Sequence, residues 1–158
     1  MPTRLLALVP ALALAGCAWF RTDPPEYESL RLESGLVVRD LVVPEAGTEV
    51  GSGDTVAVNY DLWLEDRSLV ESSTSTGRPL RFLVGAGEVP SGLDQGVLGM
   101  RLFGRRRLTV PPELAYGPEG RPPRIPADTT LIFDVELMEH VPMQAQHQAQ
   151  KPDERDGL

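Results

Sequence analysis

Cysteine and histidine are scarce in this sequence, and their scarcity excludes several classes of site. Cys17 is the only cysteine in 158 residues, so the chain can form no internal disulfide and no zinc site built on paired cysteines. The two histidines, His140 and His147, follow an expected strand and stand in a polar tail, with no metal-ligand or catalytic spacing. We therefore expect neither a metal nor a cofactor.

Positive charge is also in short supply. The chain has 15 lysines and arginines against 23 acidic residues, and its formal net charge is −8. This balance disfavours nucleic acid or an anionic lipid surface as the partner. The local exception is a group of four arginines, at positions 101, 105, 106 and 107. We interpret it as a solvated strand edge, with a binding patch as the less favoured alternative, because the residues from Leu108 on predict a strand.

Long apolar runs are absent except near the N-terminus. Arg4 is followed by an apolar run over residues 5–15, too short to cross a bilayer as a helix but typical of a secretory signal peptide. The run ends in Leu14-Ala15-Gly16-Cys17, which resembles the lipobox of bacterial lipoproteins. That resemblance implies removal of residues 1–16 and acylation of Cys17. The alternative is an ordinary secretory signal with a chance cysteine.

An acylated Cys17 would determine where the protein resides. Its lipid would anchor the chain to a membrane of the bacterial cell envelope, with the rest of the chain facing the periplasm. Ala18 follows the cysteine, in place of the Asp that retains lipoproteins at the inner membrane in some bacteria. The outer membrane is therefore favoured over the inner one.

Composition divides the remainder into three parts. Residues 17–33 mix prolines and charges with few periodic apolar positions, which predicts a flexible tether. Residues 141–158 are rich in Gln and charge, and we expect a disordered polar tail. Between them, residues 34–140 suffice for one hydrophobic core and not for two. No heptad, repeat or long apolar edge favours an oligomer, so we expect a monomer.

Most of the central domain alternates with a period of two, which is typical of strands. The pattern predicts strands over residues 36–43, with an irregularity near Arg39-Asp40, and over residues 55–64, where five apolar side chains point to one face. Further strands are expected after the turn at 64–68 and over residues 79–84, 106–110 and 129–138.

One short helix is expected within this domain. Ser91 with Asp94 three positions later resembles a capping box, and the apolar spacing of Leu93 and Val97 gives about two turns that end near Gly99. A small antiparallel sheet with a single helix over its apolar face is an α+β domain.

Several short motifs, taken in order, resemble the FKBP-type peptidyl-prolyl isomerases. They are Val56 to Ser73 (VAVNYDLWLEDRSLVESS), FLVG at 82–85, GLDQGV at 92–97, LTVP at 108–111, LAYG at 114–117 and IPADTTLIFDVEL at 125–137. The resemblance covers about residues 34–140. It implies a curved antiparallel sheet wrapped around a short helix, prolyl isomerase activity and proline-containing polypeptides as clients.

The stretch at residues 111–126 holds six prolines, and the resemblance explains their use. Rotation about an X-Pro bond faces a barrier of about 18–20 kcal/mol and needs no acid, base or metal. An apolar pocket that favours the twisted amide over the planar one accelerates it. The resemblance implies that this loop forms one wall of that pocket, and its prolines stiffen the wall.

The resemblance also assigns the pocket residue by residue. Tyr116 is expected to donate its phenolic hydroxyl to the substrate carbonyl, with Tyr60 and Glu71 beside it as the other catalytic residues. Core filling is the alternative role for each pocket residue, equally favoured for Val89 and Phe133 and least favoured for Tyr116 because of its loop position. The expected substrate-binding residues are Phe82, Val89, Pro90, Leu93, Ile125, Phe133 and Val70.

Four of these positions depart from the family pattern. Val70 stands where Phe is usual, Glu71 replaces Asp, and Leu93 replaces the Trp that floors the pocket. Pro90 has no N–H where the family offers a backbone donor to a ligand, unless a shift of one position places Ser91 there. We therefore predict reduced isomerase activity in folding of envelope or secreted proteins. The alternative is a non-catalytic peptide-binding module or chaperone.

Overall fold

The structure, a computed structural model, describes residues 28–149, which form short strands and short helices. Its strands are β1 (Ser29–Arg31), β2 (Val37–Val42), β3 (Thr55–Leu64), β4 (Leu69–Ser72), β5 (Leu80–Leu83), β6 (Arg105–Val110) and β7 (Leu131–Val141). Its helices are α1 (Ser73–Thr76), α2 (Ser91–Gly96) and α3 (Met143–Ala149), with 3₁₀ turns η1 (Pro112–Leu114) and η2 (Gly117–Glu119). None of the helices in this range has the length and apolar composition to cross a bilayer. The predicted signal peptide and Cys17 lie outside the described residues.

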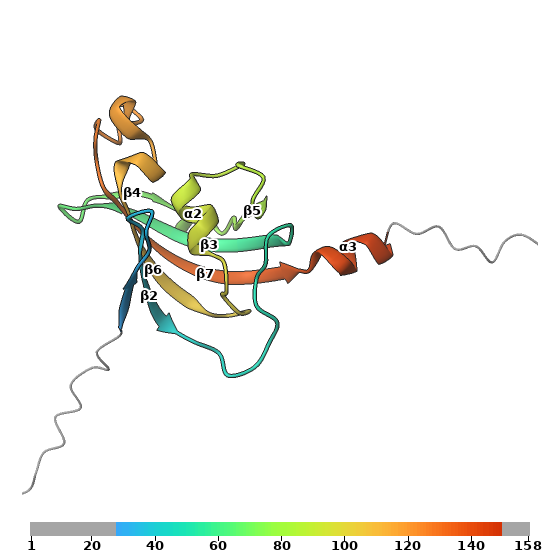
Figure 1. Ribbon diagram of the computed structural model, residues 1–158. Coiled ribbons are helices and arrows are strands. Elements are labelled where there is room, and N and C mark those ends of the chain that lie inside the picture. The colour runs from blue at the N-terminus through green and yellow to red at the C-terminus, as the bar shows by residue number, and fades with distance from the viewer. Residues whose placement is uncertain (1–27, 150–158) are drawn as a thin grey trace, which may run out of the picture.

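The seven strands form one antiparallel sheet in the order β1-β2-β6-β7-β3-β4, with β5 paired to the first half of β3 (Figure 1). β3 is central, because β7 pairs along its whole length on one side while β5 and β4 share the other. The sheet curves, and α2 lies over one face of it (Figure 1). The predicted fold, a curved antiparallel sheet around a short helix, is confirmed.

The core forms where the alternating pattern of the strands meets α2. Along β7, Leu131, Phe133, Val135 and Leu137 are at most 2% exposed, and the residues between them are partly exposed. β7 therefore turns one apolar row toward the core and one mixed row toward solvent. Removing these side chains from water is the main stabilising contribution to the domain.

Two glycines let α2 lie close to the sheet. A Cβ at Gly92 would collide with the side chain of Val110, and one at Gly96 would collide with that of Leu108. Leu93, between them in α2, is only 1% exposed. The first turn of α2 is thus held directly over the end of β6, and this places the residues at its start beside the loop that follows β6.

The prediction of α2 was correct in position and wrong in its ends. The N-cap is Pro90, without a side-chain capping bond, and the helix ends at Gly96. The Ser91 hydroxyl instead donates to the Leu114 carbonyl at 3.3 Å, and the Asp94 carboxylate accepts from the Gly85 amide at 2.8 Å. The expected capping-box side chains bind neighbouring loops, so they attach the helix to its surroundings.

The predicted tether, residues 17–33, extends too far into the domain. Ser29–Arg31 form β1, which pairs with Val37–Arg39 at the edge of the sheet. All three residues of β1 are exposed, so backbone hydrogen bonds to β2 hold them rather than side-chain burial. Alternation of apolar residues could not indicate a strand that buries no side chain.

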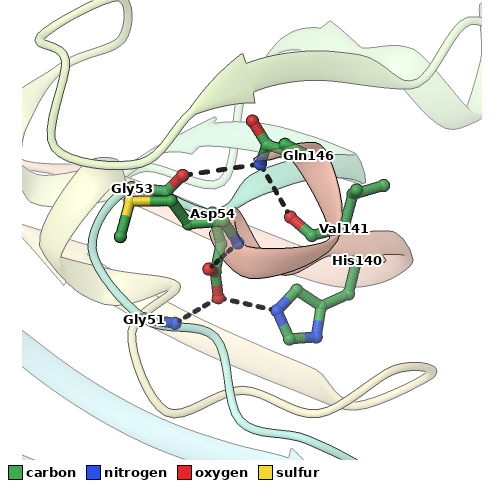
Figure 2. Close-up of polar contacts among 7 residues, drawn as sticks. Gly51, Gly53, Asp54, His140, Val141 and Gln146 are labelled. Atoms are coloured by element: carbon green, nitrogen blue, oxygen red, sulfur yellow. Dashed lines mark hydrogen bonds and ion pairs between the residues drawn. The ribbon is translucent and has the colours of Figure 1, made fainter. Parts of the chain in front are cut away.

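The predicted disordered tail, residues 141–158, is also wrong at its start. β7 continues to Val141, and Met143–Ala149 form α3, at the far end of β7 (Figure 1). The Asp54 carboxylate anchors this helix, since its Oδ1 accepts from the Met143 amide at 2.9 Å. Gln146 adds hydrogen bonds from its side-chain amide to the carbonyls of Val141 at 3.0 Å and Gly53 at 3.5 Å (Figure 2).

The group of four arginines is not a solvated strand edge. β6, which holds three of them, lies inside the sheet between β2 and β7. Arg106 binds both carboxylate oxygens of Asp40 and the carbonyls of Gly96 and Leu98, and its side chain is only 12% exposed. Arg107 forms a two-point pair with Asp134 at 2.6 and 2.7 Å. Arg106 thus links β6 to β2 and to the end of α2, and Arg107 links β6 to β7.

Candidate functional site

A cavity of about 250 Å³ opens between β3, β7, the start of α2 and the loop that follows β6. Aromatic and aliphatic side chains supply most of its wall, and three charged groups lie among them. Its lining residues are Tyr60, Leu62, Glu71, Leu80, Glu88, Val89, Pro90, Leu93, Tyr116, Arg121 and Phe133.

Tyr60, on β3, occupies one side of this cavity. Its hydroxyl donates to Glu71 Oε1 at 2.6 Å, and its ring centre lies 6.1 Å from that of Phe133 at a tilt of 47°. Burial, together with the hydrogen bond to Glu71 and the charge of that carboxylate, raises the pKa of Tyr60. The hydroxyl therefore stays protonated at neutral pH, and it donates its hydrogen bond to Glu71.

Tyr116 lines the same cavity and lies between η1 and η2. Its carbonyl accepts from the Gly120 amide at 3.1 Å, and the next residue, Gly117, accepts from the Asp128 amide at 3.0 Å. These bonds fix the loop that presents the ring. Among residues 28–149, no partner binds the Tyr116 hydroxyl, whereas the Tyr60 hydroxyl is taken. Tyr116 is therefore the phenolic donor available to a ligand in the cavity.

Arg121 connects the two tyrosines. Its guanidinium carbon lies 5.9 Å from the centre of the Tyr116 ring, within the range of a cation–π contact. Its Nη1 lies 3.7 Å from Glu71 Oε2, a loose ion pair with the arginine side chain 62% exposed. The carboxylate that binds Tyr60 on one oxygen thus faces a cation with the other.

Leu93 and Pro90 form the floor and one rim. Leu93 gives the cavity an aliphatic floor without the stacking area of an indole. Pro90 lines the rim and Ser91 does not. The Pro90 carbonyl accepts from the amides of Leu93 and Asp94 at 2.9 and 3.1 Å. Because proline has no N–H, this rim offers a ligand no backbone donor at that residue.

Seven of the ten predicted pocket residues meet in this cavity, namely Tyr60, Glu71, Val89, Pro90, Leu93, Tyr116 and Phe133. Val70 and Ile125 lie instead on a neighbouring cavity of about 220 Å³, which also contains Glu71 and Arg121. Phe82 is 3% exposed and belongs to the hydrophobic core, where it pairs with Val56 across β5 and β3.

Two charged lining residues, Arg121 and Glu88, were absent from the sequence prediction. Glu88 accepts from the Leu83 amide at 3.0 Å, which closes the loop before α2. Arg121 directly precedes Pro122-Pro123 in the loop already expected to form a wall. The sequence therefore offered one signal for Arg121, namely its place in a loop that was expected to line the pocket.

The cavity suits a reaction that needs an apolar binding surface and one hydrogen-bond donor and that involves no proton transfer. An apolar cradle can hold a proline ring, and a free hydroxyl can bind the carbonyl of the amide as it twists and loses resonance. Within residues 28–149, no cluster of three or more His, Cys, Asp or Glu side chains could hold a metal. X-Pro rotation is a chemistry that such a cavity can accelerate.

Comparison with known proteins agrees with this geometry. The profile of the FKBP-type peptidyl-prolyl cis-trans isomerase family matches residues 47–138. "FK506-binding protein 2" of Yarrowia lipolytica is 40% identical over 136 residues, which cover 85% of this chain and 91% of that protein. "FK506-binding protein" of Neisseria meningitidis serogroup C is 41% identical over 103 residues, which cover 65% and 94%.

Solved structures share the fold as well. The crystal structure of FkpA from Escherichia coli superposes with a TM-score of 0.66 at 36% identity, over 75% of this chain and 54% of that one. Several other curated relatives are longer, and this chain spans only 23% to 32% of their length. The chain belongs to the family of FKBP-type peptidyl-prolyl cis-trans isomerases.

Proposed function

We propose that this protein is a lipid-anchored prolyl isomerase of the bacterial envelope that assists folding of envelope or secreted proteins, with activity lowered by its altered pocket. The observation that carries the proposal is the Tyr116 hydroxyl, which has no partner within residues 28–149, at a cavity lined mostly by aromatic and aliphatic side chains. A substrate proline would lie on Leu93 and Phe133, and the carbonyl of the preceding residue would accept from Tyr116.

The proposed reduction in rate follows from two lining residues. Pro90 removes a backbone donor, a loss of about 0.5–1.5 kcal/mol in net terms. Leu93 removes stacking area that an aromatic floor would supply, about 0.5–1.5 kcal/mol more. Since each 1.36 kcal/mol of transition-state stabilisation is a factor of ten, the expected rate is about one to two orders of magnitude below that of a member with both features.

Exchange NMR on a short X-Pro peptide tests the activity. The full chain in detergent micelles should accelerate cis-trans exchange, and Tyr116→Phe should slow it by about 2- to 10-fold, because one hydrogen bond to the carbonyl is lost. Phe103→Leu, a change at an exposed aromatic residue remote from the cavity, is the matched control. Equal rates for the wild type and Tyr116→Phe would contradict the assigned role of Tyr116.

The second candidate is a peptide-binding module or chaperone without useful catalysis. Pro90 and Leu93 favour it, because they weaken the pocket without closing it. This candidate predicts that a folded chain binds proline peptides but leaves their exchange rate unchanged, and that Tyr116→Phe barely alters the binding constant.

The anchor rests on Cys17 and has its own test. Mass spectrometry of the mature chain should find an acylated N-terminal cysteine, and density fractionation of membranes should place it with the outer membrane. Cys17→Ser should move the chain to the soluble periplasmic fraction, because at least about two membrane signals are needed for stable anchoring. A Cys17→Ser chain that stays in the membrane at wild-type level would disprove anchoring through lipid.

A further inference from the structure

The two cavities beside the Tyr116 loop adjoin and differ in charge. The first is lined by two carboxylates, Glu71 and Glu88, and one guanidinium, Arg121. The second is lined by one carboxylate, Glu71, and two guanidiniums, Arg121 and Arg124. Counting formal charges, the first carries −1 and the second +1. A ligand that spans both cavities therefore meets a positive environment only in the second.

The loop that carries both arginines is closed on itself. The Arg121 amide donates to the Ile125 carbonyl at 2.8 Å, the Ile125 amide returns a bond at 3.1 Å, and the Arg124 amide donates to the Arg121 carbonyl at 3.2 Å. Ile125, at 2% exposure, fixes this loop to the core, and Pro122 and Pro123 limit its backbone. The two cations are thus held on one short turn beside the cavity.

Carboxylates bind these two guanidiniums more weakly than they bind those of the sheet. Arg106 and Arg107 each bind a carboxylate through two nitrogens. Arg121 has only the loose contact with Glu71 at 3.7 Å, and within the described part of the chain Arg124 has no carboxylate within 4.0 Å. A guanidinium without a close carboxylate partner can bind an incoming carboxylate in its fork geometry.

We propose that the second cavity is a subsite for an acidic side chain on the residue immediately before the substrate proline, with Arg121 and Arg124 as the specificity residues. The proposal rests on the proposed function of Tyr116. The carbonyl that accepts from Tyr116 belongs to the residue before the proline. Arg121 contacts the Tyr116 ring and lines both cavities, so the proposed position of that residue's side chain is the adjoining second cavity, beside the two guanidiniums.

Exchange NMR with a matched peptide series tests the subsite. Four peptides differ only in the residue before proline, which is Glu, Gln, Leu or Lys, and the full chain in detergent micelles is compared with Arg121→Gln, Arg124→Gln and the double variant. The readout is the ratio of kcat/KM for Glu over Gln within each variant, so a general loss of activity cancels. Arg81→Gln, a change at an exposed arginine paired with Glu139, is the control.

The wild type should favour Glu over Gln by about 3- to 10-fold, because each exposed charge pair contributes at most about fivefold. The ratio should fall to about 1 in the double variant and in 0.5 M salt, and stay at the wild-type value in Arg81→Gln. A wild-type ratio near 1, a preference for Lys, or a ratio unchanged in the double variant would overturn the subsite. No acceleration of any peptide by a folded chain would instead overturn the proposed catalysis.

Discussion

Asp54 and Glu71 each accept a hydrogen bond from a side chain with an aromatic ring, His140 for Asp54 and Tyr60 for Glu71. The remaining contacts of the two carboxylates differ. Asp54 accepts from His140 Nε2 and the Gly51 amide, both at 2.8 Å, and from the Met143 amide at 2.9 Å (Figure 2). Its side chain is 9% exposed and that of His140 is 5% exposed. Every oxygen of this carboxylate is satisfied by the protein.

Glu71 has one short bond, from Tyr60, and its other oxygen reaches Arg121 only at 3.7 Å. Its side chain is 39% exposed and lines both cavities. The difference shows how to separate a structural carboxylate from a functional one. Asp54 joins the start of β3 to the end of β7 and to α3. Glu71 has one oxygen that can still accept a hydrogen bond from a ligand or a charged neighbour.

The largest expected effect is the loss of the saturated carboxylate. Asp54→Ala should lower the free energy of unfolding by about 3 kcal/mol, because it leaves the buried His140 side chain and two partly buried amide hydrogen bonds without their acceptor. Urea unfolding followed by far-UV circular dichroism measures it. Glu71→Ala is the paired variant and should cost about 1 kcal/mol or less, since its partners reach solvent. Equal losses for the two variants would remove the distinction.

Acid should remove the Asp54 contribution without any mutation. Burial by itself raises the pKa of Asp54, but the bonds from Gly51, His140 and Met143 outweigh it and lower that pKa below its ordinary value of 3.8. A lowered pKa means that this stability is fully present above pH 3.8 and is lost as pH falls through the folded-state value.

The measurement is the free energy of unfolding of the wild type and of Asp54→Asn between pH 6 and pH 2. The difference between the two proteins should be constant down to about pH 4 and then shrink, because protonated Asp54 resembles the amide. A difference that stays constant to pH 2 would contradict the assignment.

A smaller effect is expected from the open carboxylate. Tyr60→Phe removes the bond that orients Glu71, and it should slow exchange of X-Pro peptides by about 2- to 10-fold while changing stability by about 1 kcal/mol or less. Exchange NMR and urea unfolding on the same sample give both numbers. A variant that loses stability and keeps its rate would place Tyr60 with the structural groups.

The smallest effect concerns the last hydrogen bonds at the Asp54 end. Gln146→Ala removes bonds to Val141 and Gly53 from a partly exposed side chain, and it should cost about 0.5–1 kcal/mol. Amide hydrogen exchange should show faster opening of residues 143–149 alone. Faster exchange throughout β7 would mean that α3 supports the whole sheet.

The sheet could be predicted from the sequence because its strands alternate between apolar and polar residues. β3 carries that pattern in its sequence and β7 carries it from Leu131 to Leu137, and the irregularity expected near Arg39-Asp40 is the register shift between Asp40 and Val42. β1 and α3 could not be predicted from their own sequences, because contacts with other segments stabilise them. β1 pairs with the backbone of β2, and α3 is anchored by Asp54, which is far away in sequence.

The candidate site could be predicted as far as its aromatic and aliphatic residues, through the family motifs. Its charges could not, because their meaning depends on distance. Nothing in the sequence says that Arg106 is bound on every side while Arg121 has only a loose partner. Phe82 shows the converse, since an aromatic residue in a matching motif lies in the core.

The position of β7 in the sheet has a consequence for how the chain acquires its structure as it emerges, N-terminus first, from a ribosome or a membrane channel. Among the described residues β7 is the last strand to emerge, yet it joins the β1-β2-β6 half to the β3-β4-β5 half. Until residues 131–141 have emerged, the two halves share no strand pairing. Contacts between distant segments form slowly. A nascent chain arrested before Leu131 should therefore remain open to protease, and the fold should close only as the final strand emerges.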